Sequence, residues 1–92
     1  MNKIVIMSIV TLDSLGHLNE YMERYNSVED AKKDAEDKIS EWLEENHLTL
    51  DEQNEDWKYD HARRIDYGYM IEVHDTMSIA ELDVYIKEFV IE

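Results

Sequence analysis

The sequence predicts an α+β domain in which an antiparallel sheet of about four strands carries one long amphipathic, acidic helix on one face. Three observations lead to this prediction: an early β-branched apolar run, one apolar stripe with helical spacing over residues 28–45, and two later segments in which apolar and polar residues alternate. The chain has 92 residues and contains no stretch rich in proline, glycine or serine. We therefore expect a single domain, 1–92.

The first strand is predicted over residues 4–10, which are almost continuously apolar and mostly β-branched. This pattern is typical of a strand that is covered on both faces or lies at the centre of a sheet. Residues 11–17 contain Asp13, Ser14 and Gly16, which favour a turn.

Residues 18–25 fit two structures. Leu18, Met22 and Tyr25 fit a helical stripe, whereas Tyr21, Glu23 and Tyr25 fit one face of a strand. We favour a strand, because the next element begins at once and leaves no room for a helix without a sharp corner at Asn26.

A helix is predicted from about residue 28 to residue 45. Ser27 and Asp30 have the spacing of a capping box. The apolar stripe that follows contains Val28, Ala31, Ala35, Ile39, Trp42 and Leu43. We expect its last four members to face a sheet that includes the first strand.

A second, short helix is possible from Leu50 to Trp57, because Thr49 and Glu52 repeat the capping-box spacing. The acidic character of this stretch is equally compatible with a loop.

Two closing strands are predicted. Tyr67 to Val73 alternates apolar and polar residues, and a turn over 75–78 follows. In residues 79–91 the apolar positions change parity at Phe89 and Ile91, as a bulge would require. A helix that starts from a capping box of Ser78 and Glu81 fits this segment nearly as well, but its β-branched residues favour a strand.

Charge is the most informative feature of the composition. Aspartate and glutamate outnumber lysine and arginine by 23 to 9, which gives a net charge of −14. Between residues 34 and 56, ten carboxylates accompany a single base, Lys38. Such a surface attracts basic partners and repels nucleic acid and anionic membranes. The predicted partner-binding residues are Asp34, Asp37, Glu41, Glu44, Glu45, Asp51, Glu52, Glu55 and Asp56, with Tyr85 as an exposed aromatic anchor.

No enzyme, metal or cofactor signature is present. The four histidines lack metal-ligand spacing, and the serines lack the context of an activated nucleophile. Cysteine is absent, and residues 3–12 read as neither a signal peptide nor a membrane span, so we expect a cytoplasmic protein. Arg63 and Arg64 are expected to pair with acids at 56, 60 and 66 rather than to bind nucleic acid directly.

The predicted helix carries about as many acids as a DNA strand of the same length carries phosphates. Eighteen residues span ~27 Å, a length that holds about eight phosphates of one B-DNA strand, and residues 28–45 contain eight acids. A small, cysteine-free, acidic domain of this kind resembles the accessory proteins of bacteriophages and mobile elements. That class includes inhibitors of CRISPR nucleases, restriction enzymes and DNA-repair glycosylases that imitate the charge of DNA. The resemblance is one of type across the whole chain, carries no family motif and assigns no residue a role.

Two hypotheses follow. The first is a non-enzymatic inhibitor or DNA mimic from a bacterial cytoplasm, whose acidic surface binds the basic groove of a nucleic-acid-handling enzyme. The second is a structural or interaction subunit that self-associates through a sheet edge or an apolar face, with the acidity serving solubility.

Overall fold

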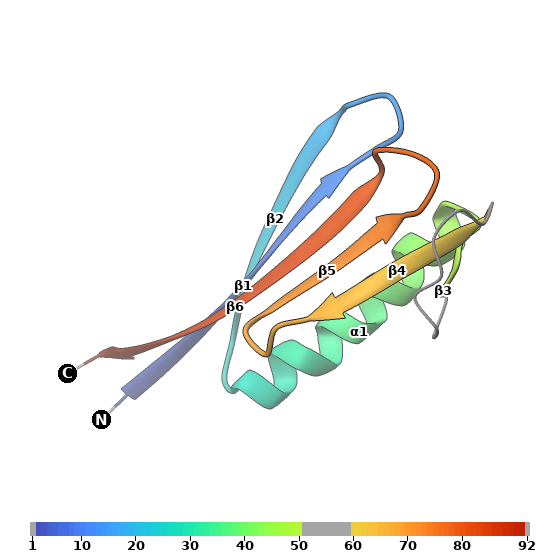
Figure 1. Cartoon of the computed structure of the whole chain (residues 1–92). Coiled ribbons are helices and arrows are strands. Elements are labelled where there is room, and N and C mark those ends of the chain that lie inside the picture. Colours follow the sequence, from blue (N-terminus) through green and yellow to red (C-terminus); the bar gives the residue numbers. More distant parts are fainter. Residues whose placement is uncertain (1, 51–59, 92) are drawn as a thin grey trace.

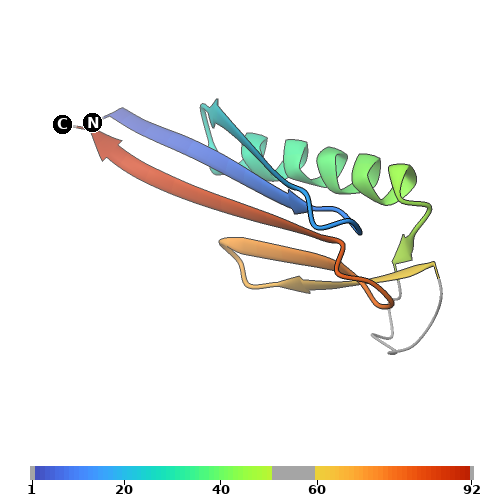
Figure 2. The ribbon, with the colours of Figure 1, turned by 90° about the horizontal axis from the view of Figure 1, so that it is seen from above.

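The computed structural model of the chain describes residues 2–50 and 60–91 (Figure 1). Its elements follow one another as β1 (Asn2–Leu12), β2 (Leu18–Tyr25), α1 (Val28–Glu45), β3 (Thr49–Leu50), β4 (His61–Asp66), β5 (Met70–Asp75) and β6 (Glu81–Ile91). The strands form one sheet in the order β2-β1-β6-β5-β4-β3. Figure 2 shows α1 lying along one face of this sheet.

The predicted sheet of about four antiparallel strands is therefore wrong, although the α+β class is right. The described sheet has six strands and is mixed, because β3 pairs parallel to β4 while the other neighbours are antiparallel. Thr49 and Leu50, expected at the start of a second helix, form β3. The rest of that predicted helix lies outside the described residues.

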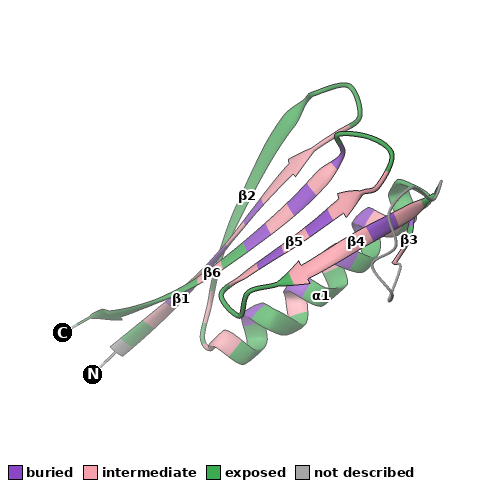
Figure 3. Cartoon of the chain, in the orientation of Figure 1, coloured by how far each residue is buried: buried purple, intermediate pink, exposed green. Residues whose placement is uncertain are grey.

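The core forms where α1 packs on β6 and β1, and Ile71 and Val73 of β5 belong to the same buried cluster. Alternate residues of β1 (Val5, Met7, Ile9) point toward α1 and are buried. The helix buries Ala31, Ala35, Ile39 and Trp42, and Leu43 packs at the margin of the same cluster. These contacts confirm the predicted apolar stripe. Figure 3 shows the buried residues alternating along β1, β5 and β6.

The start of α1 also agrees with the prediction. Ser27 has an extended backbone, and its side chain accepts a hydrogen bond of 3.1 Å from the amide of Asp30. This bond satisfies one of the free N–H groups of the first turn.

Residues 18–25 form a strand, as favoured, and pair with β1 in an unbroken antiparallel register from Leu12↔Leu18 to Val5↔Tyr25. Asp13 shapes the connecting turn, where its Oδ1 accepts hydrogen bonds from the amides of Leu15 and His17. The helix leaves β2 largely exposed, so this strand is held chiefly by its pairing with β1.

The bulge expected in the last strand is absent. β6 pairs with β1 without interruption from Glu81 to Ile91, so Phe89 and Ile91 point to the face opposite α1. The ends of β1 and β6 project beyond α1 (Figure 2), and neither of their faces is covered there. Apolar residues in this part of β6 therefore need not stay on one face, which explains the change of parity. The projection gives extents of 48 × 28 × 17 Å and a radius of gyration of 14.2 Å, above the ~12 Å of a compact chain of this length.

The strand predicted from Tyr67 begins only at Met70, because Tyr67, Gly68 and Tyr69 form the turn between β4 and β5. Gly68 adopts a φ of 91°, which favours glycine, and its amide donates to Asp66 Oδ1. The preceding strand, β4, was not predicted, since its sequence HARRID has no clear apolar alternation. Within the described residues, no helix has the length and apolar character needed to cross a membrane.

Candidate functional site

Among the described residues of the predicted binding surface, four exposed carboxylates lie together toward the end of α1: Asp37, Glu41, Glu44 and Glu45. We call them the acidic end of α1. All four carboxylates are exposed, because the buried stripe of α1 that ends in Trp42 leaves them outside the core. The last turn of α1 contains no basic residue. Negative charge at this end of a helix faces the negative pole of the helix dipole, which costs up to ~1 kcal/mol per exposed charge.

Two other carboxylates of α1 already have partners inside the protein. Asp34, a predicted partner-binding residue, is part-buried and accepts a hydrogen bond from the hydroxyl of Tyr25 on β2. Glu36 receives two hydrogen bonds from the guanidinium of Arg64 on β4, one of them 2.8 Å long. This fork lowers the pKa of Glu36 and raises that of Arg64. Arg64 also lies 3.6 Å from Asp66, one of its expected partners.

The helix-facing side of β2 holds a small network of phenols and carboxylates. Tyr21 and Tyr25 both donate to Oε2 of Glu23, which lowers the pKa of Glu23. Burial, together with hydrogen bonds to Asp34 and Glu23, raises the pKa of Tyr25 far above its usual range. The ammonium group of Lys38 lies 5.2 Å from the centre of the Tyr21 ring, a cation–π contact. Lys38 therefore points toward β2.

A groove runs beside the acidic end of α1. It has a volume of about 160 Å³ and lies between the helix and strands β1 and β2. Its lining combines apolar and aromatic side chains with charged ones: Ile9, Thr11, Tyr21, Lys38, Glu41, Trp42, Glu45 and Leu82. We call it the Trp42 groove. Glu41 and Glu45 belong both to this groove and to the acidic end, so carboxylates stand next to aromatic rings.

Among the other predicted residues that the structure describes, Tyr85 does not join this site. Tyr85 is 40% exposed, but its position in the β6 register places it on the face of the sheet opposite α1. Asp51, Glu52, Glu55 and Asp56 lie outside the described residues. Sequence reasoning missed Tyr21 and the Trp42 groove, because nothing in a sequence reports the gap between two packed elements.

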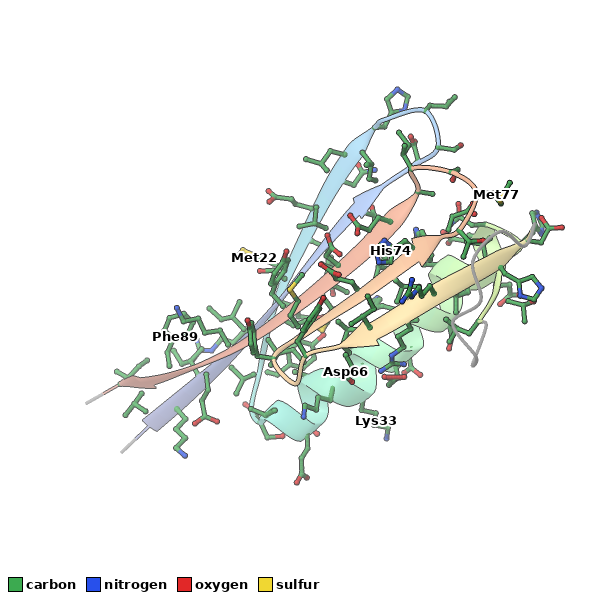
Figure 4. All side chains as sticks on the ribbon, in the orientation of Figure 1. Met22, Lys33, Asp66, His74, Met77 and Phe89 are labelled. Atoms are coloured by element: carbon green, nitrogen blue, oxygen red, sulfur yellow. The ribbon has the colours of Figure 1, made fainter. Side chains whose placement is uncertain are left out.

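A second ionisable cluster lies on the face opposite α1, near the end of β5 and the start of β6, where Figure 4 labels His74. His74 Nδ1 lies 3.3 Å from Glu81 Oε1, and its Nε2 lies 3.9 Å from Glu72 Oε2. Ligand atoms of these three residues lie within 4.8 Å of one another. Half-exposed carboxylates commonly gather in this way without a metal, and we assign none.

Asp83 adjoins this cluster and should make the stability depend on pH. Burial, reinforced by the charges of Glu81 and Glu72 and opposed by His74, raises the pKa of Asp83 from 3.8 to about 6. Between these two values the folded chain binds more protons than the unfolded chain, so this contribution to the free energy of unfolding rises as the pH falls.

We therefore expect Asp83→Asn to be more stable than the original chain at pH 7 and to lose this advantage as the pH falls below 6. The measurement is urea unfolding of dilute protein at several pH values. Glu20→Gln, which removes a more exposed acid from the same face, is the control. A difference between Asp83→Asn and the original chain that stays constant across pH would contradict the assignment.

Comparisons with known proteins add no relative. The chain matches no protein-family model, and neither curated proteins nor solved structures give a match.

Proposed function

We propose that this is a non-enzymatic binding protein of a bacterial cytoplasm that uses the acidic end of α1 to dock on the basic groove of a nucleic-acid-handling enzyme, such as a defence nuclease. The proposed partner is a protein; direct contact with nucleic acid or membrane is disfavoured by the charge of −14.

One observation carries this proposal. The last turn of α1 contains no basic residue, while Glu41, Glu44 and Glu45 are exposed at the helix end where the dipole disfavours them. A surface that served solubility alone gains nothing from this placement, since acids near the start of the helix would serve equally well and would stabilise it.

The spacing supports a DNA-like surface. Asp37 and Glu45 are eight residues apart, which corresponds to ~12 Å along a helix. About three to four phosphates occupy that length of one B-DNA strand, and four carboxylates occupy it here. This is a shorter mimic than the eight acids of the whole helix suggested, because Asp34 and Glu36 have partners within the chain.

The Trp42 groove supplies a place for part of a basic side chain. Lysine and arginine carry long apolar stems, which pack on apolar and aromatic surface while the charged head stays near an anion. Within the chain Lys38 already packs in this way, since its ammonium group lies over the Tyr21 ring, and Glu41 and Glu45 lie beside it in the same groove. We expect the partner's side chain in this groove to be an arginine that contacts a phosphate when the partner binds nucleic acid, and that contacts Glu41 or Glu45 when the partner binds this protein.

The test is affinity capture from a bacterial lysate, with short duplex DNA used to release the bound protein. The Glu41→Lys/Glu44→Lys variant should lose the captured protein. A matched variant, Glu29→Lys/Asp30→Lys, changes the net charge equally at the other end of the same helix and should retain it. Capture that withstands both the reversal and the DNA would contradict the proposal.

Self-association, the second hypothesis, does not compete for the same surface. That hypothesis names a sheet edge or an apolar face, and the exposed sheet face opposite α1 is considered next.

A further inference from the structure

The face of the sheet opposite α1, which we call the open face, is not covered by any described element (Figures 1 and 2). It nevertheless carries large apolar side chains. Met22 is 70% exposed, Leu18 is 65% exposed, and Tyr85 and Phe89 are 40% and 42% exposed. Figure 4 labels Met22 on β2 and Phe89 on the projecting end of β6.

The strand registers arrange the open face in rows that run across the sheet. The central row contains Met22, Ser8, Tyr85 and Met70. On the side toward the projection, the next row contains Arg24, Ile6 and Lys87. On the other side, the next row contains Glu20, Val10, Asp83 and Glu72. We call these two flanking rows the cationic row and the acidic row.

The basic residues of the cationic row lack an ionic partner among the described residues, whereas in the acidic row Glu72 lies 3.9 Å from His74. In this strongly acidic protein, Arg24 and Lys87 make no ion pair with any described carboxylate. Lys87 instead lies 5.2 Å from the ring centre of Phe89. Across the central row, Oδ1 of Asp83 is buried and has no hydrogen-bond partner among the described residues.

We propose that the open face is the interface of a homodimer, in which a second copy packs face to face about a two-fold axis that runs along the central row. Such an axis lays each strand over its own counterpart with the direction reversed and places the cationic row over the acidic row. Lys87 then faces Asp83 of the second copy, and Arg24 faces Glu20 of the second copy. Ile6 likewise falls over Val10 of the second copy.

This arrangement obeys the symmetry of a two-fold interface, in which every contact occurs twice. It needs Lys87 and Asp83 to lie on one strand at equal distances on either side of Tyr85, and Arg24 and Glu20 to lie likewise around Met22. Both conditions hold in the register. Aligned sheets pack at about −30°, so the pairs closest to the middle of the face align best.

The part of the open face that the proposed axis overlays has the size of a small interface. Among the described strands, only β2, β1 and β6 carry open-face residues on both sides of the central row, so the overlaid part covers about 14 by 27 Å, or about 400 Å² before side-chain relief. Each partner in a standard interface buries ~800 Å². In the proposed dimer both helices lie on the outside, so both acidic ends of α1 stay accessible, and the dimer does not depend on the proposed function.

The test is sedimentation equilibrium of the original chain and of single charge reversals. The original chain should form a dimer. Lys87→Asp and Asp83→Lys should each weaken self-association at least tenfold, because each places like charges opposite each other twice. Lys33→Asp, an exposed reversal on the outer side of α1, should not weaken it.

Mixing the two reversed variants distinguishes this register from any other use of the face. A heterodimer of Lys87→Asp with Asp83→Lys pairs opposite charges at both positions, so an equimolar mixture should recover dimer. Far-UV circular dichroism checks that each variant is folded. Arg24→Glu with Glu20→Arg repeats the test on the exposed strand β2.

Three results would overturn the proposal: an original chain that stays monomeric at every concentration, single reversals that still form dimers, or mixtures of folded variants that remain monomeric.

Discussion

Replacing Trp42 with alanine should lower the free energy of unfolding by about 3–5 kcal/mol, the usual cost of removing a buried aromatic side chain. Trp42 is the largest side chain that α1 buries, and only 7% of it is exposed. A domain of this size has about 5–14 kcal/mol of stability. The substitution should therefore remove a large share of that stability and lower the melting midpoint by more than about 12 °C.

Thermal and urea unfolding measure this effect. Ser40→Ala, at an exposed position two residues earlier in the same helix, is the control and should leave the midpoint nearly unchanged. A Trp42→Ala midpoint within a few degrees of the original chain would mean that α1 does not pack on the sheet as described.

The second large effect is a loss of partner binding together with a gain in stability. The Glu41→Lys/Glu44→Lys variant places cations at the C-terminal end of α1, where the helix dipole favours them by about 0.3–1 kcal/mol each. Its melting midpoint should rise while its binding to the captured partner falls below detection, since repulsion replaces attraction. The Glu29→Lys/Asp30→Lys control should have a lower melting midpoint, because the helix dipole disfavours cations at the N-terminal end. It should still bind the partner, because that end lies outside the proposed site.

This opposition separates a functional surface from a solubilising one. If the acids serve only solubility, reversing either pair should change binding little. A variant reversed at Glu41 and Glu44 that is more stable and still binds would rule out the acidic end of α1 as the site.

The elements that the sequence predicted well are those whose signals are local. The helix bounds follow from the Ser27 cap and from an apolar stripe that ends near residue 45. The first strand follows from its β-branched run, and residues 18–25 were assigned to a strand for lack of room before the helix.

The errors arose where a local pattern had a tertiary cause. Tyr67 and Tyr69 alternate with polar residues as a strand would, yet they lie in a turn built around Gly68. The strand β4 has little apolar alternation of its own, because Ala62 fills the core position and Arg64 reaches across to Glu36. Only the folded chain brings these residues together.

Tertiary contacts also decide which of the predicted binding residues on α1 remain available to a partner. Asp37, Glu41, Glu44 and Glu45 remain exposed, as their helical positions imply. Asp34 on α1 instead accepts a hydrogen bond from Tyr25, which comes from strand β2. The sequence reported how many carboxylates the helix has, and the fold decides which of them have partners.

The most direct test of the DNA-mimic proposal is a competition titration of the captured partner between this protein and short duplex DNA, followed by calorimetry at two salt concentrations. The proposal predicts that the two ligands exclude each other, that affinity falls steeply with salt, and that Glu41→Lys/Glu44→Lys does not compete with DNA. A partner that binds this protein and DNA at the same time, with an affinity indifferent to salt and to the reversal, would contradict it.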